Sequence, residues 1–554
     1  MIVFWPPARY FALAVLFLGL QACGGGGGGD TAAPASPVVA ASTATAVLIS
    51  GVATFDSVPN KTSAAPFGSL VYANTTTKPI RGVTVQLISA ADGTTVLAST
   101  TSSEQGSYAM SVPSNTQFFL RMRAELINTS GTSTWNVTVR DNTQGDALYV
   151  LDGAALPSGT ANRVVDIRAA SGWNGSSYGA MRAGGIAAIL DTIYSGIKVV
   201  STAQPASVFP ALNVMWSPLN TTVAGNLAAG EIGTSFFASN TAGARFIYLL
   251  GKEGIDTDEY DSAVVAHEYG HYLQSAFSTS HSLGGSHGYP DKLDMTVAFS
   301  EGWGNAWAGI SRNSPYYSDS FGLSQGSGFT FRLDIPATDI ERGWYREDSI
   351  DASLYVLSTQ QGFAPIWAAL TGPMKTTQHA LASIFSFADA VRTAGNAGVT
   401  TAMNTLLSAQ SIFTGTGASQ WGTNEINNGG ELANLPVYTT LAYGASTPVC
   451  FSASNVSADG TANKLGSTRY FRINLTPAQA GTRTVTANFG NGRDVDFEVF
   501  QNRTRLVNAA SVATSALTET ATVSLQAGEV VIRALDWVTT TPPTGAACAT
   551  IKIS

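Results

Sequence analysis

The sequence predicts a multidomain protein in which an α+β segment is flanked by two all-β sandwich domains. The chain has 554 residues, which is too long for one ordinary domain. Residues 47–168 and 446–554 carry short β-branched runs separated by turn residues, as β-sandwiches do. Residues 171–445 instead carry apolar side chains at helical spacing. These three observations set the predicted fold class and the predicted domain boundaries.

The amino-acid composition indicates which kinds of macromolecule the protein is expected to bind. Charged residues make up 12% of the chain, and the formal net charge is −8. The sequence contains no basic run or basic stripe, which is the usual feature of proteins that bind nucleic acid. We therefore expect no nucleic-acid partner.

The first 22 residues have the pattern of an export signal peptide. Arg9 precedes an apolar run over residues 10–20, which is too short to cross a bilayer as a mature helix. The segment ends at Ala22 followed by Cys23, which resembles the signal of bacterial lipoproteins. The resemblance implies that Cys23 is lipidated and anchors the chain in the bacterial outer membrane, on either its periplasmic or its cell-surface face, because Gly24 rather than Asp follows. The alternative is a plain secretory signal with an incidental cysteine.

Residues 23–46 are expected to form a flexible linker, because six consecutive glycines and a stretch rich in Ala, Ser, Thr and Pro cannot pack a core. The next segment, 47–168, is predicted to be a small β-sandwich, with a hairpin signal at Asp92 and Gly93. Its residues 79–113 resemble the prealbumin-like, carboxypeptidase-regulatory-like domains found beside secreted peptidases.

The last predicted domain, residues 446–554, has alternating runs that predict strands over 469–475, 483–489, 495–500, 523–528 and 530–536. It resembles the pre-peptidase C-terminal domains that follow secreted bacterial peptidases. Cys450 and Cys548 lie near its two ends, and an exported chain with two such cysteines is expected to join them in a disulfide. The alternative is two separately buried thiols.

The motif HEYGH, residues 267–271, is the strongest chemical signal in the chain. His267 and His271 are four residues apart, so on a helix they project from one face and can direct two imidazole nitrogens at one zinc ion. Glu268 is rotated by about 100° from His267, which places its carboxylate beside the metal as a general base rather than as a ligand. Helices are expected over 178–200, 262–277, 297–310, 350–358 and 381–394.

A catalytic zinc site needs a third protein ligand, and Glu301 is the candidate. It lies in AFSEGWGNAWAG, thirty residues after His271. Asn305 follows one helical turn later on the same face, while Trp303 and Trp307 are expected to point into the core. The alternative is an ordinary amphipathic helix with a solvent-facing glutamate.

Together, HEYGH and SEGWGNAW resemble the gluzincin zinc metallopeptidases, most closely the fungalysin-like and thermolysin-like branches. The resemblance implies an α+β catalytic domain over 171–445 that hydrolyses protein or peptide substrates. It also implies that Asn305, which stands where the family has an aspartate, orients a ligand histidine. The family's transition-state donor is a histidine that this chain lacks, which leaves Tyr345 or Arg346. The strand expected over 244–251 would be the sheet edge along which a peptide lies.

Several other residues are weaker candidates. His281 and His287 lie in a Gly/Ser-rich loop, where they either border a cleft or are merely exposed. Asp291 and Asp294, in the same loop, are alternatives to Glu301 as a zinc ligand. A cluster of acidic residues before the motif either holds calcium or is a helix-entry cluster; its members are Asp256, Asp258, Glu259 and Asp261.

The sequence therefore favours an exported, lipid-anchored zinc metallopeptidase with one Zn²⁺ per chain. Two other functions stay open. One is a non-catalytic surface binding protein built on a peptidase-like fold, although the intact Glu268 argues against loss of catalysis. The other is a zinc hydrolase that acts on a non-peptide bond.

Overall fold

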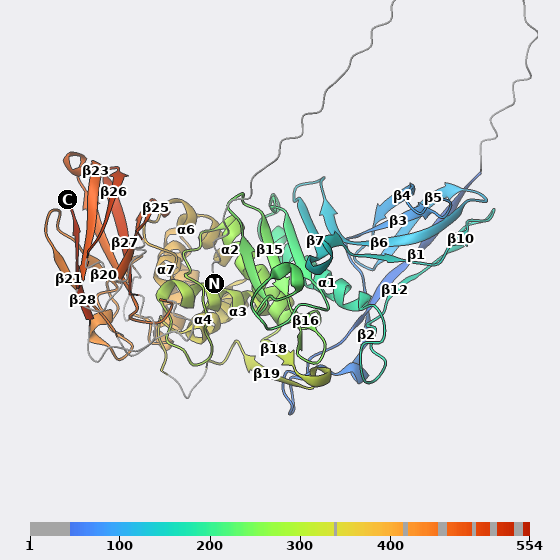
Figure 1. Cartoon of the computed structure of the whole chain (residues 1–554), viewed down its shortest axis with the longest axis horizontal. Helices are drawn as coiled ribbons and strands as arrows, with labels where there is room; N and C mark the ends of the chain where they lie inside the picture. The colour runs from blue at the N-terminus through green and yellow to red at the C-terminus, as the bar shows by residue number, and fades with distance from the viewer. Residues whose placement is uncertain are drawn as a thin grey trace, which may run out of the picture.

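The computed structural model describes residues 45–336, 341–413, 419–452, 462–489, 495–509, 518–536 and 547–554. The signal peptide, the lipidation site Cys23 and nearly all of the linker lie outside the described residues and stay predictions. The molecule is elongated, with the first β-strands at one end, the helices in the middle and the last β-strands at the other end (Figure 1). The model thus has the multidomain, β-rich character that the sequence predicts.

The first sheet forms around the long strand β1 (Ala46–Ser57). Alternate residues of β1 face the core, as a half-buried strand requires, and include Val47, Ile49 and Phe55. The other strands of this sheet are β2 (Thr76–Pro79), β5 (Ser107–Pro113), β11 (Arg163–Val164) and β12 (Ile167–Ala169).

The second sheet has ten strands and continues across the boundary predicted between residues 168 and 171. Strand β7 pairs in parallel with β13, which places Val139 opposite Val214. The alternation of apolar residues predicts the strands. It does not predict that β7 pairs with a strand about 70 residues later in the sequence. The main path is β14-β15-β13-β7-β6-β3-β4. Its strands are β3 (Val83–Ser89), β4 (Val96–Thr101), β6 (Gln117–Asn128), β7 (Trp135–Asp141), β13 (Leu212–Trp216), β14 (Phe236–Ser239) and β15 (Arg245–Leu249), and the short strands β8 (Ala147–Leu148), β9 (Val150–Asp152) and β10 (Leu156–Pro157) pair beside them.

Two details of this sheet bear on the predictions. Asp92 accepts hydrogen bonds from the backbone N–H groups of Thr94 and Thr95, and this turn joins β3 to β4, so the predicted hairpin is confirmed. The prediction that 244–251 forms the sheet edge is wrong, because β14 pairs along β15 and is itself the edge strand. Strand β14 has only four residues, at the lower limit of length for which apolar alternation identifies a strand.

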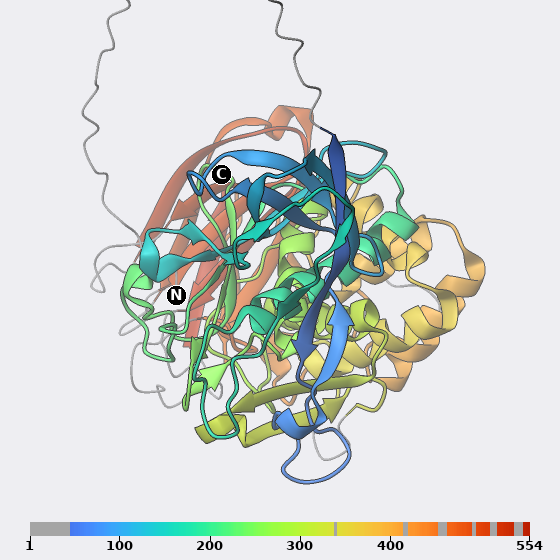
Figure 2. The same ribbon diagram turned by 90° about the vertical axis from the view of Figure 1, so that its right-hand side faces the viewer.

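Two of the helices pack against the second sheet, and the helices together fill the middle of the molecule (Figures 1 and 2). Helix α1 (Ala183–Ala203) is long and apolar enough to cross a membrane, but most of it is buried inside the protein, as in the core helix of a globular domain. The remaining helices are α2 (Ser262–Phe277), α3 (Met295–Arg312), α4 (Glu347–Gln361), α5 (Ala364–Thr371), α6 (Pro373–Thr376), α7 (Ile384–Thr393) and α8 (Ala397–Ala409). All five expected helices are present, whereas α5, α6 and α8 were not expected.

A four-stranded sheet lies beside the start of α2 and consists of β16 (Gly251–Lys252), β17 (Asp256–Thr257), β18 (Tyr316–Phe321) and β19 (Ser327–Arg332). Three aromatic rings stack across β18 and β19: Tyr317, Phe329 and Phe331. Strand β18 follows α3 directly, so it returns the chain to the N-terminal end of α2.

The C-terminal segment forms two packed sheets with their own apolar core. Cys450 and Cys548 lie opposite each other on neighbouring strands and form a disulfide, so that prediction is confirmed. One sheet consists of β20 (Tyr438–Thr440), β22 (Thr468–Leu475), β27 (Gly528–Asp536), β24 (Val495–Gln501) and β25 (Thr504–Ala509). The other consists of β21 (Thr447–Phe451), β28 (Ala547–Ile553), β23 (Gly481–Phe489) and β26 (Thr518–Leu525).

His281 lies at the junction between this sandwich and the helices, where it is buried rather than exposed or beside a cleft. Its Nδ1 accepts a hydrogen bond from the Ala382 N–H at 2.9 Å, so the ring proton is on Nε2, which donates to the Arg503 carbonyl at 3.0 Å. The backbone carbonyl of His281 accepts from Arg533 at 2.6 Å. A neutral imidazole thus joins three segments of the chain.

Acid should weaken this junction. Burial lowers the pKa of His281 from 6.5 to about 4. Because the folded-state pKa is below the unfolded value, the unfolded chain binds the proton first, and stability falls as the pH drops from about 6.5 to about 4. We expect His281 to contribute about 2 kcal/mol to the loss of stability between pH 8 and pH 5, measured as urea-unfolding free energies.

The control is His281→Gln, which has no titrating group at this position. The variant should lose that part of the pH dependence while remaining less stable than the wild type at pH 8. An identical pH dependence in both proteins would mean that other groups cause the acid sensitivity.

Candidate metal centre

Helices α2 and α3 approach each other closely because glycines face each other at the contact. A Cβ atom on Gly270 would lie 3.2 Å from the Gly304 Cα, and a Cβ atom on Gly304 would lie 2.7 Å from the His267 ring. The indole Nε1 of Trp303 donates to the Gly270 carbonyl at 2.8 Å, which fixes the contact from its apolar side. Both Trp303 and Trp307 are fully buried, as the sequence predicts.

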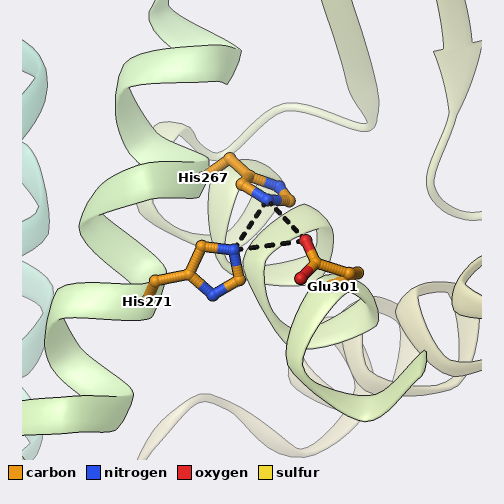
Figure 3. Close-up of side chains that lie close together, drawn as sticks. All are labelled: His267, His271 and Glu301. Atoms are coloured by element: carbon orange, nitrogen blue, oxygen red, sulfur yellow. Dashed lines mark hydrogen bonds and ion pairs between the residues drawn. The ribbon is translucent and has the colours of Figure 1, made fainter. Parts of the chain in front are cut away.

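This close approach brings His267, His271 and Glu301 together (Figure 3). The two histidine Nε2 atoms are 3.0 Å apart, and each is 3.2 Å from Glu301 Oε2. Ligand atoms around a tetrahedral zinc ion with bonds of about 2.0–2.1 Å lie about 3.3 Å from one another. The three side chains therefore have nearly the separations that a zinc ion needs, and their donor set suits zinc.

Each ligand histidine is oriented by a second side chain. His267 Nδ1 lies 2.8 Å from Asn305 Oδ1, so the ring donates its N–H to the amide oxygen and leaves Nε2 free for a metal. His271 Nδ1 lies 3.3 Å from the Ser300 hydroxyl, which donates onward to Gln274 Oε1 at 2.9 Å. Both rings thus turn Nε2 toward Glu301.

The side-chain amide of Asn305 also contacts a carboxyl group. Asn305 makes a side-chain hydrogen bond to Asp351 of α4, which is buried. Helix α4 can come this close because Gly302 has no side chain; a Cβ atom there would lie 2.7 Å from Ile350. Burial raises the pKa of Asp351 well above its ordinary value, so a protonated carboxyl group ends the chain formed by Asp351, Asn305 and His267.

The charge of Glu301 fits a metal ligand. Burial alone would raise its pKa, but His271, His287 and His267 together hold the pKa well below its ordinary value. The carboxylate is therefore ionised at neutral pH. An ionised oxygen beside two imidazole Nε2 atoms is a donor set that divalent zinc prefers.

Glu268 is buried beside the ligands, and its carboxylate has no hydrogen-bond donor among the residues that the structure describes. Tyr317 packs its ring edge to face against His267, at 6.1 Å between centroids, and its side chain interacts electrostatically with Glu268. Burial raises the pKa of Tyr317 well above its ordinary value, so its hydroxyl keeps its proton. A free base and a free hydroxyl donor thus flank the candidate centre.

His287 is the site residue whose placement the sequence left undecided. Its Nε2 lies 3.4 Å from Glu301 Oε2 and 3.8 Å from Glu347 Oε2. The loop is held by the C-terminal segment: Lys464 Nζ donates to the Ser286 carbonyl at 2.8 Å, and Asn463 donates to the same oxygen at 2.9 Å. The histidine content of the loop was the available signal, but loop spacing has no periodicity that predicts where a side chain points.

The other candidates are occupied elsewhere. The Tyr345 hydroxyl donates to Glu341 at 2.8 Å, and the Arg346 guanidinium donates to Asp348 and to the Asp291 carbonyl, so the structure does not support either as a transition-state donor. The structure does not group the alternative ligands Asp291 and Asp294 with the two histidines, and their carboxylates have other partners. Asp291 accepts from Lys464 at 2.7 Å, and Asp294 caps α3 and accepts from Tyr470 at 2.7 Å.

No model of a known protein family matches this chain, and no curated protein matches it. Among solved structures, the precursor of protealysin, a metalloproteinase from Serratia proteamaculans, is 9% identical with a TM-score of 0.30, over 52% of this chain and 89% of that chain. The pre-peptidase C-terminal domain of a collagenase from Bacillus anthracis is 7% identical with a TM-score of 0.16, over 21% of this chain and 94% of that chain. Similarities at these TM-scores are too weak to assign the chain to a family.

Gly304→Ala should weaken metal binding. Its new methyl group would lie 2.7 Å from the His267 ring, so the imidazole must turn away from Glu301. We expect a fall of about tenfold to a hundredfold in zinc affinity, measured by competition with a chromophoric chelator.

The matched control is Gly309→Ala in the same helix. Its methyl group would press on the side chains of Leu333 and Tyr355, away from the ligands. Both variants should lose stability, but only Gly304→Ala should lose zinc affinity. Equal zinc affinity in the two variants would contradict the role of Gly304.

Proposed function

We propose that this chain is an exported zinc metallopeptidase of the gluzincin type. The observation that supports the proposal best is the triangle of His267, His271 and Glu301 with the uncommitted carboxylate of Glu268 beside it. A structural helix pair would not need to bury three polar side chains around one point or to leave a fourth without a partner.

In this proposal His267, His271 and Glu301 hold the zinc ion. When bound, zinc supplies a Lewis acid that makes a water molecule more acidic and polarises a carbonyl group. Glu268 takes a proton from the attacking water and passes it to the nitrogen of the leaving amine. Asn305 and Ser300 keep the two imidazole rings in the orientation that the ligands need.

In this proposal two further side chains are candidates to stabilise the developing negative charge on the carbonyl oxygen. His287 presents Nε2 to the ligand triangle, and the ring of Tyr317 packs against His267. A positioned donor of this kind is worth about a hundredfold to a thousandfold in kcat. His287 Nδ1 lies 3.1 Å from the Gly285 carbonyl and donates to it, so Nε2 can donate only from the protonated ring. Burial lowers the pKa of His287, but Glu301 and Glu347 raise it by more, and we assign the donor role to this protonated form.

Strand β14 is the place where an extended substrate would pair. It is the outer strand of the ten-stranded sheet, and its pairing with β15 leaves its other side without a described neighbour strand. Unpaired backbone groups of an edge strand can bind a peptide as an additional strand. This edge suits a peptide better than a compact non-peptide molecule, although a zinc hydrolase with another substrate stays the second candidate.

The proposal also includes the cellular location of the protein. The anchor at Cys23 and the outer membrane follow from the resemblance to lipoprotein signals, and an oxidised Cys450–Cys548 pair suits an exported protein. Substitution of Cys23 by Ser should then release the protein into the soluble fraction.

Glu268→Gln and Glu301→Gln separate a catalyst from a metal-binding protein. Glu268→Gln should keep one zinc per chain and lose turnover by at least about a hundredfold, because the amide cannot accept the proton. Glu301→Gln should lose zinc as well as turnover, because a neutral oxygen replaces an ionised ligand. The measurements are metal analysis and digestion of a diverse peptide library.

The pair of variants also distinguishes the rival functions. Stoichiometric zinc in Glu301→Gln would exclude Glu301 as the third ligand. A zinc-loaded wild type that cleaves no peptide would favour the binding protein or the hydrolase of a non-peptide bond.

His287→Gln and Lys464→Met test whether the C-terminal segment helps to build the site. His287→Gln should lower kcat by about a hundredfold, and Lys464→Met should lower it less, because the loop loses only one of its anchors. Zinc content should be unchanged in both. Lys375→Met, at an exposed lysine of α6, is the matched control.

If His287→Gln instead loses zinc, His287 is a ligand rather than a donor. If Lys464→Met behaves like Lys375→Met, the hydrogen bonds from the C-terminal segment do not position the loop.

A further inference from the structure

A small cavity lies where the C-terminal sandwich meets the helices. On one side it is lined by Asp294 and Met295 at the start of α3 and by Asn434. On the other side it is lined by β22 and the turn before it, with Arg469 and Tyr470 among the residues. The cavity has room for about one water-sized occupant. None of the three residues of the ligand triangle lines it, so it is a separate place in the molecule.

The arginine of this cavity is buried without a counter-charge. Arg469 is 7% exposed, and no carboxylate within ion-pair distance accompanies it among the residues that the structure describes. Its Nε is buried and has no hydrogen-bond partner. The hydrogen bond from its Nη1 to Asn434 Oδ1 is 3.4 Å long. A donor group of Arg469 is therefore unsatisfied at the wall of a cavity.

The other buried arginines of the described chain are all paired. Three are buried besides Arg469, and each has a carboxylate beside its guanidinium. The pairs are Arg182 with Glu259 at 2.8 Å, Arg346 with Asp348 at 3.1 Å, and Arg533 with Glu498 at 2.5 Å. A buried cation without a partner is costly, so Arg469 needs a negative group that the described residues do not supply.

The charge of Arg469 persists at neutral pH. Burial lowers the pKa of Arg469 to about 10, and burial is the only cause of this change. The guanidinium therefore stays protonated near pH 7, and no nearby carboxylate acts on it.

Asp294 also lines the cavity, but its carboxylate has other partners. Its Oδ1 accepts from the Thr296 N–H at 2.9 Å, and its Oδ2 accepts from the Tyr470 hydroxyl at 2.7 Å. No ion pair joins it to Arg469. Asp294 thus caps α3 and does not neutralise the arginine.

We propose that Arg469 binds a monatomic anion of the chloride class in this cavity, with Nε as a hydrogen-bond donor. Room for about one water-sized occupant excludes sulfate, phosphate and carboxylate groups, which have several heavy atoms. A water molecule would fill the space and accept the hydrogen bond, but it would leave the positive charge without a partner. The site does not depend on the proposed peptidase activity.

The position of the anion gives it a structural role. The two sides of the cavity belong to different parts of the chain, because Met295 begins α3 and Arg469 lies at the start of β22. The turn before β22 already contacts the segment before α3, since the Leu465 N–H donates to the Lys292 carbonyl at 2.9 Å. An anion in the cavity would strengthen this junction between the sandwich and the helices.

The test is thermal unfolding of the full chain in sodium chloride and in sodium gluconate at equal ionic strength, because gluconate is too large for the cavity. Chloride at about a hundred times its Kd should raise the Tm of the wild type by about 5 °C over gluconate. Arg469→Met should abolish this difference, because methionine has neither the charge nor the N–H donor. In gluconate the variant should be at least as stable as the wild type, because an unpaired buried charge has been removed.

Arg472→Met is the matched control. Arg472 lies three residues further along β22 and therefore on its other face, where the guanidinium lies over the Trp421 ring at 4.9 Å. This variant loses the same charge from the same strand, and it should keep the full response to chloride.

A crystal of the wild type transferred to sodium bromide locates the site directly and does not require any variant to fold. Anomalous scattering from one bromide ion beside Arg469 Nε would support the proposal. A cavity that contains only water would overturn it. Equal Tm values in chloride and gluconate, or a chloride response that survives in Arg469→Met, would also overturn it.

Discussion

The contact between α2 and α3 is the constraint on which the candidate site depends. Two glycines make it, because Gly270 and Gly304 let the two helices meet, and a third, Gly302, admits α4 on the other side of α3. Glycine inside a helix costs about 1 kcal/mol relative to alanine, so three of them in two helices require a compensating gain. The compensating gain is that the helices come close enough for the His267 imidazole and the Glu301 carboxylate to meet. Fully buried tryptophans pack behind this contact.

The same contact explains why an asparagine can stand where an aspartate was expected. A carboxylate at position 305 would place a second negative charge beside Glu301, in a buried site that already contains Glu268. Here the neutral amide of Asn305 orients His267 without that charge, and it meets the Asp351 carboxyl, whose pKa burial raises well above its ordinary value. The close packing of α4 at Gly302 brings Asp351 to Asn305.

The sequence predicts well what depends on local pattern. The helix Ser262–Phe277 and the hairpin at Asp92 rest on spacing along one element, and the disulfide rests on the chemistry of the two cysteines. The pairing of Asn305 with a ligand histidine was implied by the resemblance to the gluzincins. What it could not predict depends on long-range contact. No periodicity tells that β7 pairs with β13, that Asp351 reaches Asn305 or that Asp319 joins Asp256. The loop residues divide in the same way: His281 and His287 are six positions apart in one loop, yet one is buried at a junction and the other faces the ligands.

The chain thus contains two groups of buried carboxyl side chains, which differ in whether basic side chains accompany them. In the ligand triangle the histidines accompany Glu301, so its carboxylate is ionised and ready for a metal. In the cluster of Asp256, Asp258 and Asp319 no basic side chain is within ion-pair distance in the described residues, and burial raises the pKa of all three carboxyl groups. Strand β18 connects the two, because Tyr317 contacts His267 and Asp319 belongs to the cluster.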